Sequence, residues 1–264
     1  MALDSPVTQH NVTDFGLQEL DLQAKGLRKG FGKGAPVFTN LDFSIGRGEC
    51  VALVGANGTG KSTLLRCCLG LIAPDAGQVA LLGQDLSALG TKARRALRSR
   101  TGLVGQKHNL VPRLSVLSNV IHGLLGRHSG PRYWLQGLAP AEARGAALAA
   151  LDKVGLAPLA LRRADQLSGG QSQRVAIARA LVCKPRFLVA DEPCASLDPQ
   201  AGEEVMALFI SLVKREGVTV LFTSHNVQHA LSYGDRIIGL QGGRIAIDAP
   251  SARVSTTEMA ELYG

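Results

Sequence analysis

Long apolar runs are missing from this chain of 264 residues. A helix needs about 20 consecutive apolar residues to cross a bilayer, and no stretch of the sequence reaches that length. The first residues, MALDSPVTQHNVTDFG, also lack the basic start and the apolar run of a secretory signal peptide. We therefore expect a cytoplasmic protein whose contact with a membrane is made through partner proteins.

Cysteine is scarce as well, and its pattern excludes two classes of small domain. The five cysteines are an odd number and include no C-x-x-C pair, which argues against a disulfide framework and against a zinc site. Each lies in an apolar run or a loop of small residues, so we expect buried free thiols in a reducing compartment. They are Cys50, Cys67, Cys68, Cys183 and Cys194.

Acidic residues are outnumbered, with 21 Asp and Glu against 29 Lys and Arg, a formal net charge of +8. Such a balance fits a nucleic acid partner, an anionic membrane surface, or solubility alone. The densest basic stretch is KARRALRSR, which starts at Lys92. It favours the solvated face of a short helix over a binding patch.

The apolar pattern predicts an α/β chain. Residues 17–31 and 37–46 alternate like half-buried strands, and ECVALVG is a continuous apolar run typical of a strand buried on both faces. Further strands are expected at GQVALLG, TGLVGQ, RFLVAD, VTVLFTS and DRIIGLQGGRIAI. Residues 111–163 are helical in pattern. We expect a polar tail (1–16) and one domain (17–264).

GANGTGKS matches the phosphate-loop pattern G-x-x-x-x-G-K-[ST] and lies between a predicted strand and a predicted helix. Glycines let the backbone wrap closely around phosphates. Lys61 should reach the β- and γ-phosphates, and the Ser62 hydroxyl should bind Mg²⁺. The residues expected to bind the nucleotide here are Gly55, Ala56, Asn57, Gly58, Thr59, Gly60, Lys61, Ser62 and Thr63.

RFLVADEP supplies a pair of carboxylates where a buried strand ends, which is where open α/β sheets place their ligands. Asp191 is the expected partner of Mg²⁺, and Glu192 is the expected group that polarises the attacking water. The alternative is a charge pair at a helix N-terminus.

A second anion-binding turn is predicted at LSGGQ, directly before a helical stretch. Its residues are Leu167, Ser168, Gly169, Gly170 and Gln171. Together with GANGTGKS and VADEP, this string resembles the signature of ATP-binding cassette ATPases. The resemblance covers nearly the whole chain after the tail.

Four smaller matches extend the resemblance. Gln106 in LVGQKHNL resembles the glutamine loop, Ser196 and Asp198 in SLDP the loop after the acid pair, His225 in TSHNV the switch histidine, and Phe31 in KGFGKG the aromatic residue that stacks on adenine. From the residues alone, Phe31 is also consistent with a core position and Asp198 with a helix N-cap. Gln106 could equally be a polar strand end.

The resemblance implies a P-loop fold with a mixed sheet core, an N-terminal antiparallel β portion and a helical subdomain at about 107–183. It implies that two copies pack head to tail, so that Ser168 and Gly170 close over the ATP held at Lys61 of the other copy. His225 would sense the γ-phosphate as a catalytic residue. Gln106 would contact Mg²⁺ or the water and relay movement to a membrane partner.

The chain also resembles the energising subunits of bacterial importers, which lie on the cytoplasmic face of the inner membrane and work with a permease and a solute-binding protein. NLVPRLSVLSNVIHGLLGR, ALSYGDRIIGLQGGRI and ELYG are similar to ATPases of phosphonate importers. The solutes implied are phosphonates, phosphite or related phosphorus oxyanions. The alternatives are a polar amino acid importer and a nucleic-acid-handling cassette ATPase. We expect no nucleic acid partner, because coiled-coil and zinc modules are missing.

Overall fold

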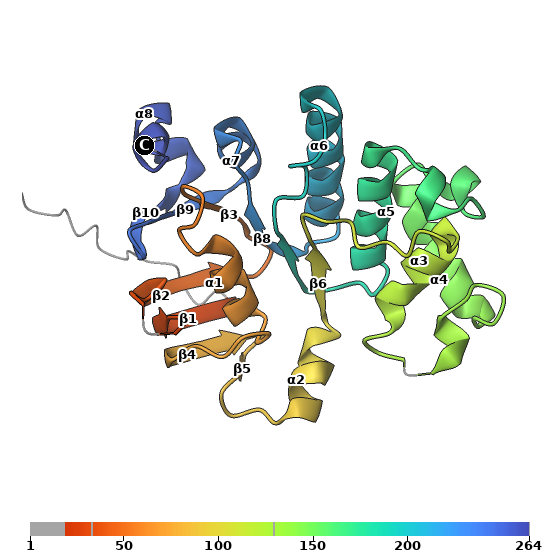
Figure 1. Ribbon diagram of the computed structural model, residues 1–264, viewed down its shortest axis with the longest axis horizontal. Coiled ribbons are helices and arrows are strands. Elements are labelled where there is room, and N and C mark those ends of the chain that lie inside the picture. Colours follow the sequence, from red (N-terminus) through yellow and green to blue (C-terminus); the bar gives the residue numbers. More distant parts are fainter. Residues whose placement is uncertain (1–18, 33, 129, 264) are drawn as a thin grey trace, which may run out of the picture.

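The structure is a computed structural model that describes residues 19–32, 34–128 and 130–263. It contains two sheets, with helices around them and a mainly helical part at one end (Figure 1). The polar tail predicted for residues 1–16 lies outside the described residues. Within the described part of the chain, no helix is both long enough and apolar enough to span a membrane.

The strands and helices follow the predicted order along the chain. The strands are β1 (Leu20–Lys29), β2 (Phe38–Gly46), β3 (Cys50–Val54), β4 (Ala76–Leu81), β5 (Gln84–Asp85), β6 (Thr101–Val104), β7 (Phe187–Ala190), β8 (Thr219–Thr223), β9 (Arg236–Gln241) and β10 (Arg244–Pro250). The α-helices are α1 (Lys61–Cys68), α2 (Thr91–Arg98), α3 (Val116–Ile121), α4 (Ala141–Lys153), α5 (Gly169–Leu181), α6 (Pro199–Arg215), α7 (Val227–Tyr233) and α8 (Thr256–Glu261).

The larger sheet is mixed and runs in the order β10-β9-β3-β8-β7-β6. Its strands pair in parallel from β9 to β6, and β10 pairs antiparallel with β9. The smaller sheet runs β2-β1-β4-β5 and is antiparallel throughout. The predicted fold class, a mixed core with an N-terminal antiparallel portion, is confirmed.

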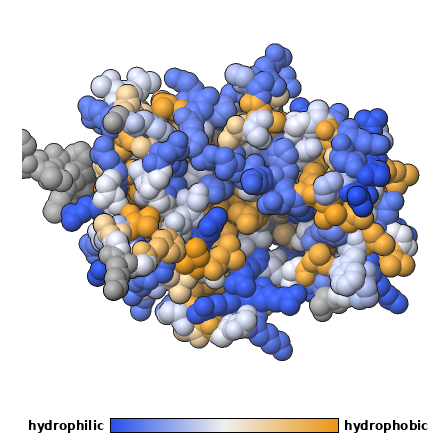
Figure 2. All heavy atoms as spheres, viewed as in Figure 1, coloured by the Kyte–Doolittle hydropathy of each residue, from blue (hydrophilic) through white to orange (hydrophobic). Residues whose placement is uncertain are grey.

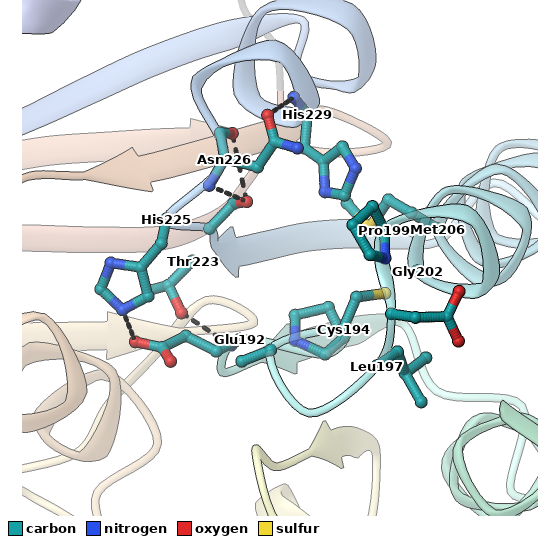
Figure 3. A pocket seen from close by; sticks show the side chains of 14 residues that line it. Glu192, Cys194, Leu197, Pro199, Gly202, Met206, Thr223, His225, Asn226 and His229 are labelled. Carbon is teal, nitrogen blue, oxygen red and sulfur yellow. Dashed lines mark hydrogen bonds and ion pairs between the residues drawn. The ribbon is translucent and has the colours of Figure 1, made fainter. Parts of the chain in front are cut away.

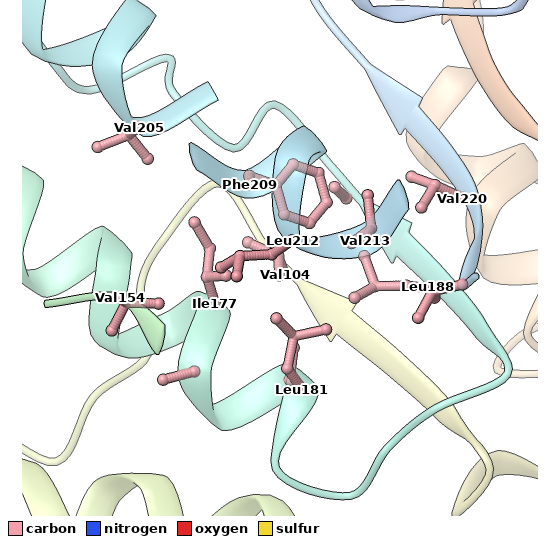
Figure 4. Close-up of a cluster of buried hydrophobic side chains, with 14 of the residues drawn as sticks. Val104, Val154, Ile177, Leu181, Leu188, Val205, Phe209, Leu212, Val213 and Val220 are labelled. Atoms are coloured by element: carbon pink, nitrogen blue, oxygen red, sulfur yellow. The ribbon is translucent and has the colours of Figure 1, made fainter. Parts of the chain in front are cut away.

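Strand β7 shows why the central strands read as continuous apolar runs. Phe187 and Val189 point into a cluster that contains residues of both sheets and of α1, whereas Leu188 and Ala190 point into a second cluster formed with α5 and α6. Figure 4 shows Leu188 in that second cluster, which also includes Phe209 and Val213 of α6. Because both faces of the strand are covered, every side chain on it is apolar.

The helices predicted for residues 111–163 include α3 and α4, and α5 follows them. Helix α5 contacts α3 and α4 on one side and α6 and β6 on the other, so it joins the helical part to the mixed sheet. Burial of Ala143, Ala147 and Ala150 explains why α4 is rich in alanine. The basic stretch from Lys92 forms helix α2, where only Leu97 is buried.

The prediction of buried free thiols holds for four of the cysteines and is wrong for the fifth. Cys50, Cys67, Cys68 and Cys183 are buried, whereas Cys194 is half-buried in the loop after β7. Burial raises the pKa of the Cys50 thiol to about 12, with the carboxylate of Asp235 adding to the effect.

Candidate functional site

The phosphate loop lies between β3 and α1, and its backbone needs glycine at defined positions. Gly55, Gly58 and Gly60 have φ values of 141°, 80° and 99°, a region that favours glycine. A Cβ atom at Gly55 would lie 2.2 Å from the carbonyl oxygen of Leu240. The loop therefore packs closely against the end of β9, and glycine is the only residue that fits at position 55.

Lys61 is the first residue of α1 and is buried inside this loop, with 6% of its surface exposed. Its ammonium group donates to the carbonyl oxygens of Gly55 (2.7 Å) and Ala56 (2.9 Å). Burial lowers the pKa of Lys61, and the carboxylates of Glu192 and Asp191 act in the opposite direction. The cation predicted to hold phosphates is thus fixed within the loop and near the acid pair.

Asp191 and Glu192 follow directly after β7, and one hydroxyl orients both. The Thr223 hydroxyl, at the end of β8, donates to Asp191 Oδ1 (2.9 Å) and accepts from the Glu192 N–H (2.8 Å). Asp191 Oδ1 also accepts from the Ser62 hydroxyl at 3.3 Å. The alternative of a charge pair at a helix N-terminus is wrong, because the next helix, α6, begins only at Pro199.

The Glu192 side chain points toward His225 (Figure 3). Glu192 Oε1 is in direct contact with His225 Nε2, with 15% of the Glu192 side chain and 36% of the His225 side chain exposed. The backbone of Glu192 has a φ of 50°, which is uncommon for a residue other than glycine. Such strain costs on the order of 1 kcal/mol and clusters at functional sites. The structure therefore brings together the predicted base and the predicted sensor.

A divalent cation fits beside Ser62 and Asp191. Their oxygens face one another at 3.3 Å, and Gln106 lines the same cavity of about 340 Å³. Mg²⁺ takes oxygen ligands and usually keeps waters and substrate phosphates in its shell. Among the described residues there is no group of three or more His, Cys, Asp or Glu side chains that could hold a metal ion without ligands from water or substrate.

The LSGGQ residues lie at the start of α5, and Ser168 is its N-cap. The Ser168 hydroxyl accepts from the Gln171 N–H (3.2 Å), and the Gln171 side chain accepts from the Ser168 N–H (3.1 Å). Ser168–Gln171 line one hollow with Ser196 and Asp198, whereas Ser62 and Asp191 line another. The N-cap role of Asp198 is confirmed, because its side chain accepts from the Ala201 N–H at the start of α6.

Phe31 is 56% exposed, so the alternative of a core position is wrong. The Lys29 ammonium lies 5.4 Å from the centre of its ring. That ammonium donates to Asp75 Oδ1 (2.6 Å), and Asp75 Oδ2 accepts from the Gly30 N–H (2.7 Å). Asp75 was not predicted as a site residue, because nothing in its local pattern distinguishes it from an ordinary turn residue.

Residues 38–195 match the family model described as ABC transporter. The chain belongs to the ABC transporter family. Two of the similar curated proteins are the phosphonates import ATP-binding protein PhnC of Nitratidesulfovibrio vulgaris (42% identity over 92% of this chain and 91% of that protein) and PhnC 1 of Pseudomonas aeruginosa (46% identity, 92% and 88%).

Solved cassettes of the ABC family have the same fold as this chain. A dimeric ATP-binding cassette in a post-hydrolysis state bound to ADP and Pi has a TM-score of 0.75 and 33% identity, and the match covers 87% of this chain and 98% of that one. The cassette cbiO1 of Clostridium perfringens, part of an ABC transporter complex, has a TM-score of 0.80 and 28% identity, with 92% and 94% covered. This ABC cassette therefore has the fold of ATP-binding subunits.

The structure adds two residues to the predicted site of this ABC cassette. Thr223 orients the acid pair as described above. Near the end of the chain, the Tyr263 hydroxyl donates to the Ser224 carbonyl oxygen at 3.0 Å, next to His225. Both contacts join segments far apart in the sequence, so no local pattern identified them.

Proposed function

We propose that this ABC cassette is the ATP-hydrolysing subunit of a bacterial phosphonate importer. Hydrolysis is supported best by one observation, the pairing of Glu192 with His225 beside the Ser62–Asp191 contact. The phosphonate class is supported by relatives named phosphonates import ATP-binding proteins, which are 42% to 46% identical over 92% of this chain. Phosphite or a related phosphorus oxyanion is the nearest variant of this proposal.

The chemistry follows from the positions of the residues. Lys61 and the N–H groups of the loop bind the β- and γ-phosphates, because a buried cation and free amides at a helix start favour an anion. Ser62 and Asp191, with Gln106 nearby, would hold Mg²⁺, which supplies positive charge to the phosphate oxygens. Glu192 orients the attacking water as the base, and His225 holds the Glu192 carboxylate and contacts the γ-phosphate.

Besides the nucleotide, this chain would bind another copy of itself. The LSGGQ turn and Ser62, the residue after Lys61, line different pockets of one chain, so we propose that the lid of each ATP comes from the opposite copy. Ser168 and Gly170 of one copy would close over the γ-phosphate bound at Lys61 of the other. ATP then links the two copies, and hydrolysis releases them.

The permease would dock on the exposed surface beside Gln106, outside the part of the cavity where Ser62 and Asp191 would hold Mg²⁺. Two exposed leucines lie at this cavity, Leu71 (51% exposed) and Leu103 (49% exposed). We accordingly propose that the chain lies on the cytoplasmic face of the inner membrane. A separate solute-binding protein and the permease would select the solute.

The test is uptake in a strain that lacks the gene for this chain. We expect the natural chain to restore uptake of a labelled alkylphosphonate, and the Lys61→Ala variant to fail because nucleotide binding is weakened. Uptake of polar amino acids should be unchanged in all strains. Restored uptake of a polar amino acid, with no effect on phosphonate, would replace the proposal by the alternative importer.

A further inference from the structure

The acidic residues of this chain are distributed unevenly. Between Cys50 and Ala141 the sequence has eleven lysines and arginines but only two acidic residues, Asp75 and Asp85. The rest of the chain has 18 lysines and arginines against 19 aspartates and glutamates. The whole positive excess therefore belongs to this middle segment.

Most of these basic side chains lie around the edge strand β6, and we call the following set the basic face. Its exposed members are Arg66, Lys92, Arg95, Arg100, Lys107 and Arg127, and Arg98 is half-buried. Among the described residues, none of the seven forms an ion pair with a carboxylate. Their charge is therefore available to a partner.

Contacts between segments show that the basic face is continuous. Arg98 donates to the Gly70 carbonyl oxygen after α1, and Arg127 donates to the Ser99 carbonyl oxygen after α2. Arg66 and Lys107 line one cavity together with Leu71 and Leu103. In Figure 2, strongly hydrophilic atoms gather over α2 beside hydrophobic atoms between α1 and β6.

We infer that the basic face binds the anionic phospholipid headgroups of the inner leaflet. This inference rests on the proposed function, because the permease groove at Leu71 and Leu103 lies within the basic face and would hold it against the bilayer. Each lysine or arginine near an anionic membrane contributes about 1 kcal/mol of favourable binding free energy, and this attraction falls off within a Debye length.

A lipid surface fits this face better than a nucleic acid does. The charges spread over α1, α2, the ends of β6 and the segment after α3, whereas a groove-binding protein presents one helix or ribbon with base-reading side chains. The lipid contact would add to the permease contact as a second attachment.

The test uses the purified full chain and protein-free vesicles in 150 mM salt. One vesicle is pure phosphatidylcholine, and the other contains 30% phosphatidylglycerol. The face variant is Lys92→Gln/Arg95→Gln/Arg100→Gln. The matched control, Arg215→Gln/Arg244→Gln/Arg253→Gln, removes the same charge from exposed residues elsewhere. Co-sedimentation measures the partition coefficient, and turnover of ATP checks that each variant is folded.

We expect binding to the anionic vesicles only. The face variant should lower that partition coefficient by roughly fivefold per residue, on the order of a hundredfold in all, and the control variant should change it little. Equal loss in both variants, equal binding to neutral vesicles, or tighter binding to duplex DNA than to anionic vesicles would each overturn the inference. Vesicle binding is measured without permease or solute, so its failure is distinct from a failure of phosphonate uptake.

Discussion

At the residue scale, Glu192 is fixed from two sides. Its N–H donates to the Thr223 hydroxyl, and its carboxylate pairs with His225. The amide of Glu192→Gln has the same shape but cannot take a proton from water. We expect this variant to bind ATP normally, to trap a closed dimer, and to lose about 10²- to 10⁴-fold in turnover.

Phosphate release measures the turnover of Glu192→Gln, and binding of a fluorescent ATP analogue measures affinity. The control is Glu261→Gln, at the end of α8, which should match the natural chain in both. Equal turnover by Glu192→Gln and the natural chain would remove Glu192 from the role of base.

Asp75 positions the segment that carries Phe31. Hydrogen bonds from Lys29 and from the Gly30 N–H lower the pKa of Asp75, so this carboxylate is charged near neutral pH. We expect Asp75→Ala to raise the KM for ATP several-fold with little change in kcat, because the adenine stacking expected of Phe31 would be weakened and the residues expected to act in hydrolysis are unchanged. Asp85→Ala is the control, since among the described residues the Asp85 side chain forms hydrogen bonds only with Ser87. A fall in kcat with unchanged KM would contradict this role.

At the element scale, two helices begin with the same capping box, and only one of them is at the candidate site. Ser168 and Gln171 cap α5, and Ser255 and Glu258 cap α8. Replacing either serine by alanine should lower the free energy of unfolding by about 0.5–2 kcal/mol. Only Ser168→Ala should also reduce ATP turnover, because its hydroxyl is proposed to contact the γ-phosphate.

Denaturant unfolding and ATP turnover, measured on both serine variants, separate the two effects. If Ser168→Ala and Ser255→Ala lose stability alike and keep full turnover, the LSGGQ turn is only a helix start. In that case the role proposed for the phosphate loop would stand, and the role proposed for the LSGGQ turn as a lid over ATP would be wrong.

At the scale of the whole molecule, the shared site predicts that two inactive variants rescue one another. Lys61→Ala damages the phosphate loop, and Gly170→Asp places a carboxylate where the γ-phosphate is expected. A Cβ atom at Gly170 would lie no closer than 4.0 Å to its neighbours, so the second variant should fold. In a mixed dimer, one site carries both defects and the other carries neither.

We therefore expect each variant alone to be inactive and the mixture to recover part of the natural turnover. Phosphate release is measured for the mixture of the two variants. Each variant alone, diluted to the same extent, is the control. A mixture as inactive as its components would indicate that each chain closes over its own ATP.

The phosphate loop, the acid pair, the signature turn and most strands were predictable from the sequence, because each depends on neighbours along the chain. Glycines at defined spacing allow the positive φ values of the loop, and a run of apolar residues is enough to indicate a strand covered on both faces. The pairing of strands and the positions of Thr223, Asp75 and Tyr263 were not predictable. These depend on contacts between segments that the sequence separates.

The sequence by itself determined the two turns that are expected to bind anions and the carboxylate pair that follows a buried strand. Only the tertiary structure decided that Phe31 is exposed, that Glu192 lies next to His225, and that exposed basic side chains lie around β6. The physical reason is the separation along the chain of the residues that interact. Backbone conformation and strand burial follow from adjacent residues, whereas ion pairing and exposure follow from which distant segments the packed core brings together.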